Sequence, residues 1–224
     1  IGADCVIAPH AVLEHNVRLG AGVKVGIGSV LGGDPQDLKW KGEDAWLEVG
    51  DRTVIREYLT INRATSYSWT TRIGKDCFLM SYVHVPHDCQ IGDGAIIANS
   101  VALAGHGLVE EHVHLSGLAA AHQYTRIGRL AFVSGLTGVT MDVAPYCTVV
   151  GARAELAGLN TVGLQRAGMT EDQIGRVKQA YKIVFRSNLG LAEAIAELDG
   201  SLGTHPEVAH FVAFLRGSQR GVTR

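Results

Sequence analysis

The sequence predicts an all-β fold, a parallel β-helix of hexapeptide repeats, followed by a small C-terminal α-helical domain. An aliphatic residue recurs every six positions through most of the chain up to Pro145. Glycine accounts for 28 of the 224 residues, nearly twice the usual ~7%, and aromatic residues make up only 6%, which favours short strands and tight turns. After Pro145 the six-residue period stops and helical spacing begins.

The repeat comprises 20 hexads, five starting at Ile1, three at Val49 and twelve at Ile73. Their first position is Ile, Leu or Val in 19 of them, with Ala121 as the exception. A period of six matches neither the 3.6 residues of a helix nor the 2 residues of a strand. It is typical of a β-helix in which each hexad makes one strand and one turn, and three hexads close a triangular coil. We therefore expect the first-position side chains to point into the coil.

Two stretches interrupt the repeat. Residues 31–48 lack the period and carry polar and aromatic residues, so we expect a protruding loop, and loops of this length are usually functional. Residues 67–72 are either a degenerate hexad or a smaller loop. We assign residues 1–150 to the β-helix and residues 151–224 to a linker and a helical domain.

The C-terminal region carries the signals of three helices. Thr170 and Gln173 form a capping box, and an apolar stripe continues from there to about Ser187. A second helix is expected over about 191–200, and a third begins near Thr204. From Thr170 onward the chain has seven cations and six acids, which indicates either an ordinary solvated face or a dock for an acidic partner. The cations are Arg176, Lys178, Lys182, Arg186, Arg216, Arg220 and Arg224.

The charge balance and the cysteines exclude several classes of protein. The chain has 20 Lys and Arg against 22 Asp and Glu, whereas a general nucleic-acid binder is far more basic, so we predict no nucleic-acid partner. No apolar run approaches the ~20 residues of a membrane span, so we predict no transmembrane segment. Cys5, Cys77 and Cys89 all take the fifth hexad position, where a small apolar side chain fits. Nothing in this pattern indicates an oxidising compartment, and we expect a cytoplasmic protein.

One column of polar residues is a candidate site. His87, Gly105 and Gln123 are all third in their hexads and recur three hexads apart, so they stack on successive coils about 4.8 Å apart. Asp88, His106 and His122 are their immediate neighbours. A base, a carboxylate that orients it and backbone N–H donors are the parts of an acyl-transfer site. The same histidines match the ligands of zinc, and spacing alone does not choose between these chemistries.

Six motifs of the chain carry a family resemblance. They are Val83-His84-Val85-Pro86-His87-Asp88-Cys89, Leu103-Ala104-Gly105-His106, His122-Gln123-Tyr124, the loop Pro35-Gln36-Asp37-Leu38-Lys39-Trp40-Lys41-Gly42-Glu43, Ile61-Asn62-Arg63 and the helical segment Ala180-Tyr181-Lys182-Ile183-Val184-Phe185-Arg186-Ser187. Together they resemble the UDP-N-acetylglucosamine O-acyltransferases of lipid A biosynthesis, and the resemblance covers essentially the whole chain. That family has a left-handed β-helix, normally with further coils before the position of Ile1, so by resemblance this chain is shortened at its N-terminus.

The resemblance implies a homotrimer with active sites in clefts between neighbouring β-helices, and it implies neither a cofactor nor a metal. The reaction moves a (3R)-3-hydroxyacyl chain from an acidic acyl carrier protein to the 3-hydroxyl of the UDP-sugar. His87 matches the general base, Asp88 the residue that orients it, and the Gly105 N–H the oxyanion donor. The positions that match substrate contacts are Asp37, Lys39, His84, His106, His122, Gln123, Asn160 and Arg166.

Some positions depart from the family pattern. Val162 replaces a Glu, Ala167 replaces a second Arg and Asn62 replaces a His, so a 3-amino analogue of the sugar stays open as the acceptor. Gly135 matches the residue that measures the acyl tail, and its missing side chain predicts preference for a long chain.

Other functions of trimeric hexapeptide proteins stay open as alternatives. A CoA-dependent acetyltransferase would lack the Gln36–Glu43 loop, and the sister N-acyltransferase of the same pathway would carry a uridine-binding domain. A γ-type zinc carbonic anhydrase would use interface histidines as ligands. A non-catalytic scaffold would leave the polar column unexplained.

Overall fold

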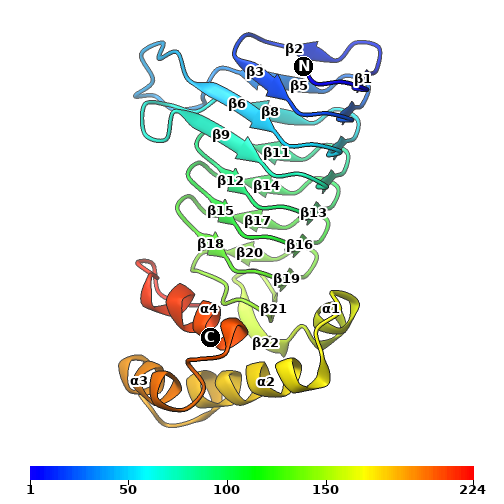
Figure 1. Ribbon diagram of the computed structural model, residues 1–224. Coiled ribbons are helices and arrows are strands. Elements are labelled where there is room, and N and C mark those ends of the chain that lie inside the picture. Colours follow the sequence, from blue (N-terminus) through cyan, green and yellow to red (C-terminus); the bar gives the residue numbers. More distant parts are fainter.

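The computed structural model describes all residues from Ile1 to Arg224 and has the form of a left-handed parallel β-helix closed by helices at its C-terminal end (Figure 1). Three sheets of parallel coil strands form the faces of a triangular prism, and from β1 to β20 successive strands fall on the first, second and third sheet in turn. The prediction of a β-helix followed by helices is confirmed.

The strands are short because each hexad contributes only a few extended residues before the next corner. The first sheet contains β1 (Val6–Ile7), β4 (Lys24–Val25), β7 (Val54–Ile55), β10 (Phe78–Leu79), β13 (Ile96–Ile97), β16 (His114–Leu115), β19 (Phe132–Val133), β21 (Cys147–Val150) and β22 (Glu155–Leu159). The second sheet contains β2 (Val12–Leu13), β5 (Val30–Gly33), β8 (Thr60–Asn62), β11 (His84–Val85), β14 (Ala102–Leu103), β17 (Ala120–Ala121) and β20 (Gly138–Val139). The third sheet contains β3 (Val17–Leu19), β6 (Trp46–Val49), β9 (Thr70–Ile73), β12 (Gln90–Ile91), β15 (Leu108–Val109) and β18 (Arg126–Ile127).

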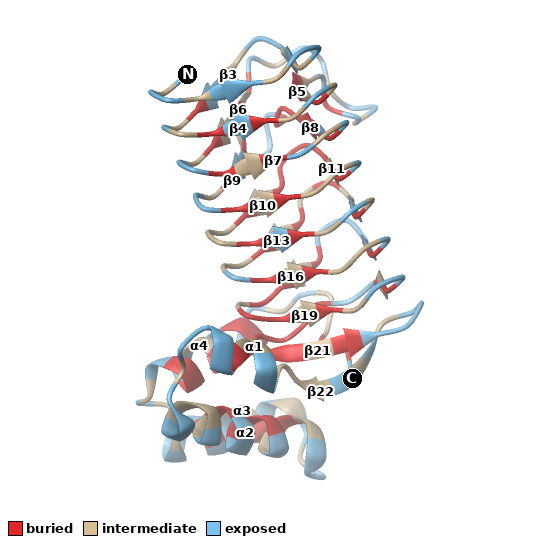
Figure 2. Cartoon of the chain, turned by 90° about the vertical axis from the view of Figure 1, so that its right-hand side faces the viewer, coloured by how far each residue is buried: buried red, intermediate tan, exposed pale blue.

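The register shows the three-hexad coil directly, since Phe78 pairs with Ile96 and His84 with Ala102. First-position aliphatic side chains from successive coils stack inside the prism, where Leu79, Val85 and Ile97 are fully buried. Figure 2 shows buried segments recurring in coil after coil along the prism. This continuous stack is the main hydrophobic core, and its burial is the dominant stabilising term. Ala121 is also buried, so the one small first-position residue still points inward.

Two excursions leave the coil on the same side of the prism near its N-terminal end (Figure 1). Arg18 pairs with Glu48 and Glu48 pairs with Arg72, and each of these pairs is separated by more chain than a regular coil contains. The first excursion spans residues 34–45, so the predicted loop over 31–48 is too long at both ends. Its outer residues belong to β5 and β6, because buried Leu31 and Leu47 continue the inward stack. The second excursion spans residues 63–69, which makes the interrupted repeat a small loop followed by a strand rather than a degenerate hexad.

The C-terminal region adds one reversed strand and four helices, α1 (Thr161–Arg166), α2 (Glu171–Arg186), α3 (Leu191–Ser201) and α4 (Pro206–Arg216). Strand β22 pairs antiparallel with β21, and neither β22 nor the short helix α1 was predicted. The capping box of Thr170 and Gln173 is present at the start of α2, as predicted. A second hydrophobic cluster packs the helices against the last coils, with Phe211 and Val208 beside Tyr146 and Cys147. None of the helices combines the length and apolar character that crossing a bilayer requires.

Candidate active site

His87 and Asp88 lie at the corner where the chain passes from β11 in the second sheet to β12 in the third. Only 7% of His87 and 3% of Asp88 is exposed, and His87 Nδ1 lies 2.8 Å from Asp88 Oδ2. Asp88 is the fourth residue of its hexad and has φ of +61°, the left-handed conformation that this corner uses in coil after coil. The sharp turn directs the carboxylate back to the imidazole of the preceding residue. When Asp88 is ionised, Nδ1 must donate to it, which leaves the lone pair of Nε2 free to accept a proton.

The Asp88 carboxylate is buried, and several hydrogen-bond donors surround it. Thr65 donates from its N–H to Oδ1 (3.2 Å) and from its hydroxyl to Oδ2 (2.8 Å), and Ser68 donates from its N–H (3.1 Å) and hydroxyl (2.6 Å) to Oδ1. Burial raises the pKa of Asp88, but the hydrogen bonds from His87, Ser68 and Thr65 outweigh it and hold this pKa well below its usual range. The carboxylate is therefore a stable anion that keeps the imidazole in one orientation.

Gly105 lies one coil beyond His87, and its missing side chain leaves the space that the imidazole occupies. The two coils are joined here by the His106 N–H, which donates to the His87 carbonyl oxygen at 3.2 Å. The N–H of Gly105 itself has no acceptor within the protein. A free backbone donor beside a base is the arrangement that stabilises a developing oxyanion.

His106 is held by two tyrosines beside this pair. Its ring stacks parallel on Tyr124 with centroids 4.3 Å apart and meets the edge of Tyr67 at 4.5 Å. Burial lowers the pKa of His106, and Asp88, whose Oδ2 lies 3.7 Å from Nδ1 of His106, opposes that effect. Nδ1 is buried without a hydrogen-bond partner, and the lowered pKa favours the neutral form of this ring, which lines the pocket.

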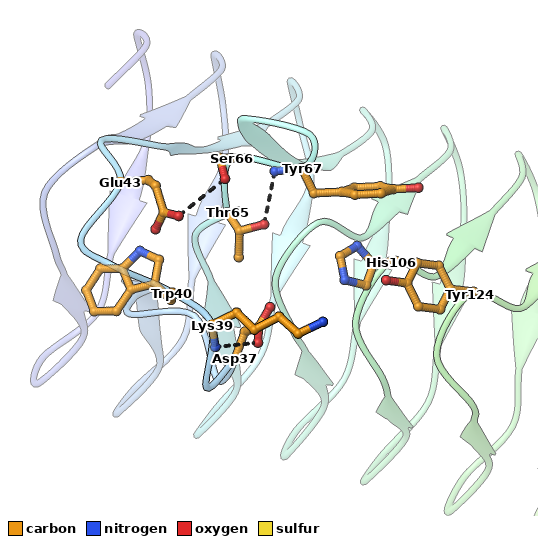
Figure 3. Close-up of a pocket in the computed structure, with 9 residues that line it drawn as sticks. All are labelled: Asp37, Lys39, Trp40, Glu43, Thr65, Ser66, Tyr67, His106 and Tyr124. Atoms are coloured by element: carbon orange, nitrogen blue, oxygen red, sulfur yellow. Dashed lines mark hydrogen bonds between the residues drawn. The ribbon is translucent and has the colours of Figure 1, made fainter.

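The first excursion covers this corner and forms a pocket of about 280 Å³ (Figure 3). Asp37 and Lys39 line it together with Trp40 and Glu43, and the Lys39 side chain extends toward His106. The pocket is completed by residues of the second excursion and the next two coils, which are Thr65, Ser66, Tyr67, His106 and Tyr124. Most of the pocket lining thus comes from two loops that have no place in the regular repeat.

A buried arginine anchors the first excursion to the coil. Arg63 is 2% exposed, forms an ion pair with Asp34 and contacts His15 through its guanidinium. The same guanidinium lies 5.7 Å from the ring of Trp40. These contacts hold both ends of the segment that carries Asp37 and Lys39.

Six predicted residues near this corner are not among those that line the pocket: His87, Asp88, Gly105, His84, His122 and Gln123. The His84 ring is bonded to the Thr60 hydroxyl (2.7 Å from Nδ1), and burial together with the nearby His87 lowers the pKa of His84. His122 and Gln123 continue the polar column on the next coil, where both are exposed, and His122 Nδ1 lies 3.1 Å from the Gln123 carbonyl oxygen.

The other predicted residues lie on other parts of the prism. Asn160 and Arg166 line a separate groove of about 780 Å³ between α1 and the outer surface of the first sheet, which also contains Val162 and Ala167. The Asn160 side chain caps α1 by accepting from the Gly163 N–H (3.0 Å), and it donates to the Leu130 carbonyl (2.9 Å). Gly135 is exposed at the corner between the first and second sheets. Within one chain these residues are not brought together with His87.

Two residues of the pocket, Asp37 and His106, form with His87 the only cluster that could hold a metal ion. One potential ligand atom each from Asp37, His87 and His106 lies within 4.8 Å of the others. Because Nδ1 of His87 faces Asp88, the free nitrogen is Nε2, the same atom that would act as a base. Zinc binding and proton abstraction therefore compete for one lone pair.

Sequence reasoning missed Thr65 and Ser68, which hold Asp88, and Tyr67 and Tyr124, which hold His106. The broken repeat before β9 was the signal for the first pair, because an insertion at one corner places extra backbone and side chains beside that corner. The second pair had a weaker signal. Tyr124 follows the polar column at a left-handed position, where its side chain projects outward.

The hexapeptide β-helix, with a buried imidazole–carboxylate pair at one corner, places the chain in the class of hexapeptide-repeat transferases. Residues 70–105 match the family described as bacterial transferase hexapeptide (six repeats). Residues 142–223 match the second domain of UDP-N-acetylglucosamine O-acyltransferase. The chain belongs to the acyl-[acyl-carrier-protein]–UDP-N-acetylglucosamine O-acyltransferase family.

Individual relatives agree along nearly the whole length of the chain. The protein of that name from Anaeromyxobacter dehalogenans is 67% identical over 194 residues, covering 86% of this chain and 76% of that protein. The crystal structure of a UDP-N-acetylglucosamine acyltransferase from Bacteroides fragilis superimposes with a TM-score of 0.96 at 34% identity, covering 100% of this chain and 87% of that one. The Arabidopsis UDP-N-acetylglucosamine acyltransferase gives a TM-score of 0.92 at 33% identity, covering 100% of this chain and 89% of that one.

Proposed function

We propose that this acyltransferase moves a (3R)-3-hydroxyacyl chain from acyl carrier protein to the 3-hydroxyl of a UDP-N-acetylglucosamine-type sugar, the first step of lipid A biosynthesis. The observation that carries the proposal is the pair of His87 and Asp88, with Nε2 of His87 free beside the unpaired Gly105 N–H. Relatives named for this donor and this acceptor support the choice of substrates. Because the donor is an acyl carrier protein, we also propose the cytoplasm as the compartment.

The chemistry follows from the two free groups. Nε2 of His87 removes the proton from the sugar hydroxyl as its oxygen attacks the thioester carbonyl carbon, and a C–O bond forms. The carbonyl oxygen becomes an oxyanion, which accepts a hydrogen bond from the Gly105 N–H. The C–S bond then breaks, and the protonated His87 returns its proton to the departing thiolate. Asp88 stabilises the imidazolium between these two steps, and a thioester is reactive enough to need no metal.

The two separated sets of residues support a trimeric enzyme. The pocket over His87 holds Asp37, Lys39 and His106, whereas Asn160 and Arg166 line the groove beside α1 on another face of the same chain. If the pocket of one protomer faces the groove of the next, the combined cleft accommodates a sugar nucleotide and an acyl chain. His84, His122 and Gln123 lie on the coils that border such a cleft, and Gly135 would meet the acyl tail.

Charge on the second helix supports a dock for the acidic carrier. Lys178 and Lys182 are exposed on one side of α2 and form no ion pair. Arg176 and Arg216, in contrast, are paired with Glu207 (2.5 Å) and Asp199 (2.6 Å). The unpaired lysines are therefore the better candidates for contact with the carrier.

The test is an acyl-transfer assay with a panel of acyl carrier protein thioesters and UDP-sugars, including the 3-amino analogue. His87→Ala should lower kcat by ~10²–10⁴, the usual cost of losing a general base, without changing the oligomeric state or the melting temperature. His10→Ala is the matched control, because His10 is an exposed histidine at the fourth position of a hexad far from the pocket. Near-normal turnover by a purified His87→Ala enzyme would contradict the proposal.

A further inference from the structure

The loop of residues 63–69 supplies most of the hydrogen bonds that reach the carboxylate of Asp88. Five hydrogen bonds reach the two oxygens, and four of them come from Thr65 and Ser68. Oδ1 receives only loop donors, while Oδ2 is shared between the Thr65 hydroxyl and Nδ1 of His87. Two N–H groups, two hydroxyls and one imidazole are partners that suit an ionised carboxylate. The Ser68 hydroxyl has a second possible acceptor, the Thr70 carbonyl oxygen at 3.2 Å, but lies closer to Asp88.

The loop is itself ordered by contacts that orient these donors. The Trp69 N–H donates to the Thr65 carbonyl (2.9 Å), which closes the loop, and the Tyr67 N–H donates to the Thr65 hydroxyl oxygen (3.1 Å). That oxygen therefore accepts from within the loop, and its own proton is directed to Asp88. The Asp88 N–H is fixed as well, because it donates to the Thr71 hydroxyl at 2.9 Å.

We propose that Thr65 and Ser68 are positioning residues of the acyl-transfer reaction, which keep Asp88 ionised and thereby hold His87 in the Nδ1–H tautomer with Nε2 free. This inference rests on the proposed role of His87 as the general base. It assigns a function to the insertion before β9, which the regular coil does not need. The insertion turns an ordinary corner into a binding site for a carboxylate.

The predicted consequence is a change in the pH at which the pair gains its first proton. A carboxylate that loses a donor becomes more basic, so the protonated pair is stabilised and forms at higher pH. The acid limb of kcat/KM should therefore move upward when Thr65 or Ser68 loses its hydroxyl. The other charged or titratable groups around the pair are His84, His106, Asp37, Lys39 and Tyr124, and these stay unchanged in the variants.

The first experiment compares pH profiles of kcat/KM for the full-length enzyme and its variants. Ser68→Ala and Thr65→Val should each lower the plateau of kcat/KM by ~10-fold and move the acid limb to higher pH by about half a pH unit. A lost hydrogen bond to a charged group changes the pKa of that group by about one unit, and only part of this change is passed on to the imidazole. Thr65→Ser keeps the hydroxyl, so its acid limb should lie at the pH of the wild-type enzyme. Thr53→Val is the matched control, because the buried Thr53 hydroxyl also makes two backbone hydrogen bonds, to the Gly74 carbonyl and from the Cys77 N–H, but none to Asp88.

The second experiment reads the tautomer without any turnover. Two-bond ¹H–¹⁵N correlation spectra of ¹⁵N-histidine-labelled enzyme distinguish Nδ1–H from Nε2–H imidazoles, and His87→Gln identifies the signal. Wild type should show His87 as Nδ1–H, and Ser68→Ala and Thr65→Val should show a mixture of tautomers. Asp88→Asn calibrates the shift, because the loop N–H groups hold the amide oxygen at the Oδ1 position and turn the amide N–H₂ toward Nδ1 of His87.

The outcomes separate this inference from the function it rests on. If Thr65→Val and Ser68→Ala lose rate no more than Thr53→Val, with unchanged acid limbs and a pure Nδ1–H signal, the two residues serve stability alone and the inference is wrong. If His87→Ala retains activity, the proposed function fails instead, whatever the loop variants do. The tautomer spectrum decides the positioning role even if a variant is too unstable for kinetics above room temperature, because it is recorded at low temperature on the folded fraction.

Discussion

The imidazole of His87 occupies the place that a side chain at Gly105 would take. A Cβ on Gly105 would lie 2.6 Å from Cε1 and 2.7 Å from Nε2 of His87, closer than real Cβ atoms approach other groups. The base and the proposed oxyanion donor therefore fit together only because one coil lacks a side chain at this corner. Glycine serves here through its small size, since its φ lies outside the left-handed range.

Gly105→Ala should displace the His87 ring and lower kcat by ~10²-fold, because a misplaced base loses most of its catalytic effect. Thermal unfolding should change little, since the ring can move toward the open pocket. The control is Gly117→Ala, at the same hexad position on a different corner, where a Cβ would meet only the Asn99 carbonyl oxygen at 3.5 Å. Equal kinetics for the two variants would show that the Gly105 contact has no part in the reaction.

The melting temperature should fall as the pH is lowered from about 7.5 to about 5.5. Burial lowers the pKa values of His84, His106 and His114 in the folded protein, so below the unfolded pKa of ~6.5 the unfolded chain binds more protons and unfolding is favoured. Asp88 behaves differently, because its lowered pKa keeps its contribution to stability down to ~pH 4, below which it is lost.

Calorimetry across this range checks the sign of the histidine effect. His114→Gln removes one of the three buried histidines and should make the melting temperature depend less on pH. His10→Gln, at an exposed position, should show the same dependence on pH as the wild type. A melting temperature that rises toward pH 5.5 would contradict the burial argument.

Carrier binding should weaken steeply with salt, since charges on protein surfaces are screened over about 10 Å at 0.1 M ionic strength. Lys178→Glu with Lys182→Glu should raise the KM for acyl carrier protein more than it lowers kcat. Lys24→Glu, at an exposed and unpaired lysine on β4, is compared with Lys178→Glu alone, because each of these single reversals changes the net charge by the same amount. A KM that responds neither to salt nor to the reversal on α2 would show that these lysines belong to an ordinary solvated helix face and do not bind the carrier.

Gly135→Met should shift donor preference to acyl chains several carbons shorter. The site accepts a side chain, because a Cβ there would meet only the Gly117 carbonyl oxygen at 3.4 Å. The added methionine would occupy space otherwise available to methylenes worth about 0.8 kcal/mol each. The measurement is kcat/KM across donors of graded length, together with the mass of the assembly. An unchanged length profile would show that Gly135 serves the turn alone.

Chelation should leave acyl transfer intact, whereas added Zn²⁺ should inhibit it reversibly. Asp37, Nε2 of His87 and His106 converge with the nitrogen and oxygen atoms that zinc binds, so the ion would take the lone pair that the reaction needs. Metal analysis of the purified enzyme, rates after dialysis against a chelator and a Zn²⁺ titration test this together. Loss of activity on chelation, restored by zinc, would favour the carbonic-anhydrase type of site over a histidine base.

The sequence allowed the coil to be predicted almost residue by residue, because one aliphatic side chain per hexad must point into the core. Its ends and interruptions were harder. Strand β22 has no hexad period, and its pairing with β21 depends on tertiary contact rather than on local pattern. The limits of the 34–45 loop were missed because Leu31 and Leu47 continue the core beside polar neighbours.

The same distinction holds for the candidate site. Stacking on successive coils correctly placed His87, Gly105 and His106 together, because the coil converts spacing along the chain into distance in space. It could not predict that Thr65 and Ser68 reach Asp88, since their loop departs from the coil and its path depends on its own hydrogen bonds. Nor could it show that the Asn160 side chain caps a helix within its own chain, because α1 was not predicted.

Strand β22 reverses direction at the C-terminal end of the prism and pairs antiparallel with β21, the last parallel strand of the first sheet. A parallel coil with a free final strand exposes a row of unpaired N–H and C=O groups to which the strand of another molecule can add. Here β21 is paired on both sides, and the Asp142–Val222 bridge ties the C-terminal segment across the last turn. The edge strand at this end is therefore β22, which runs against the direction of the coil, so a second prism cannot extend the parallel ladder of the first sheet here.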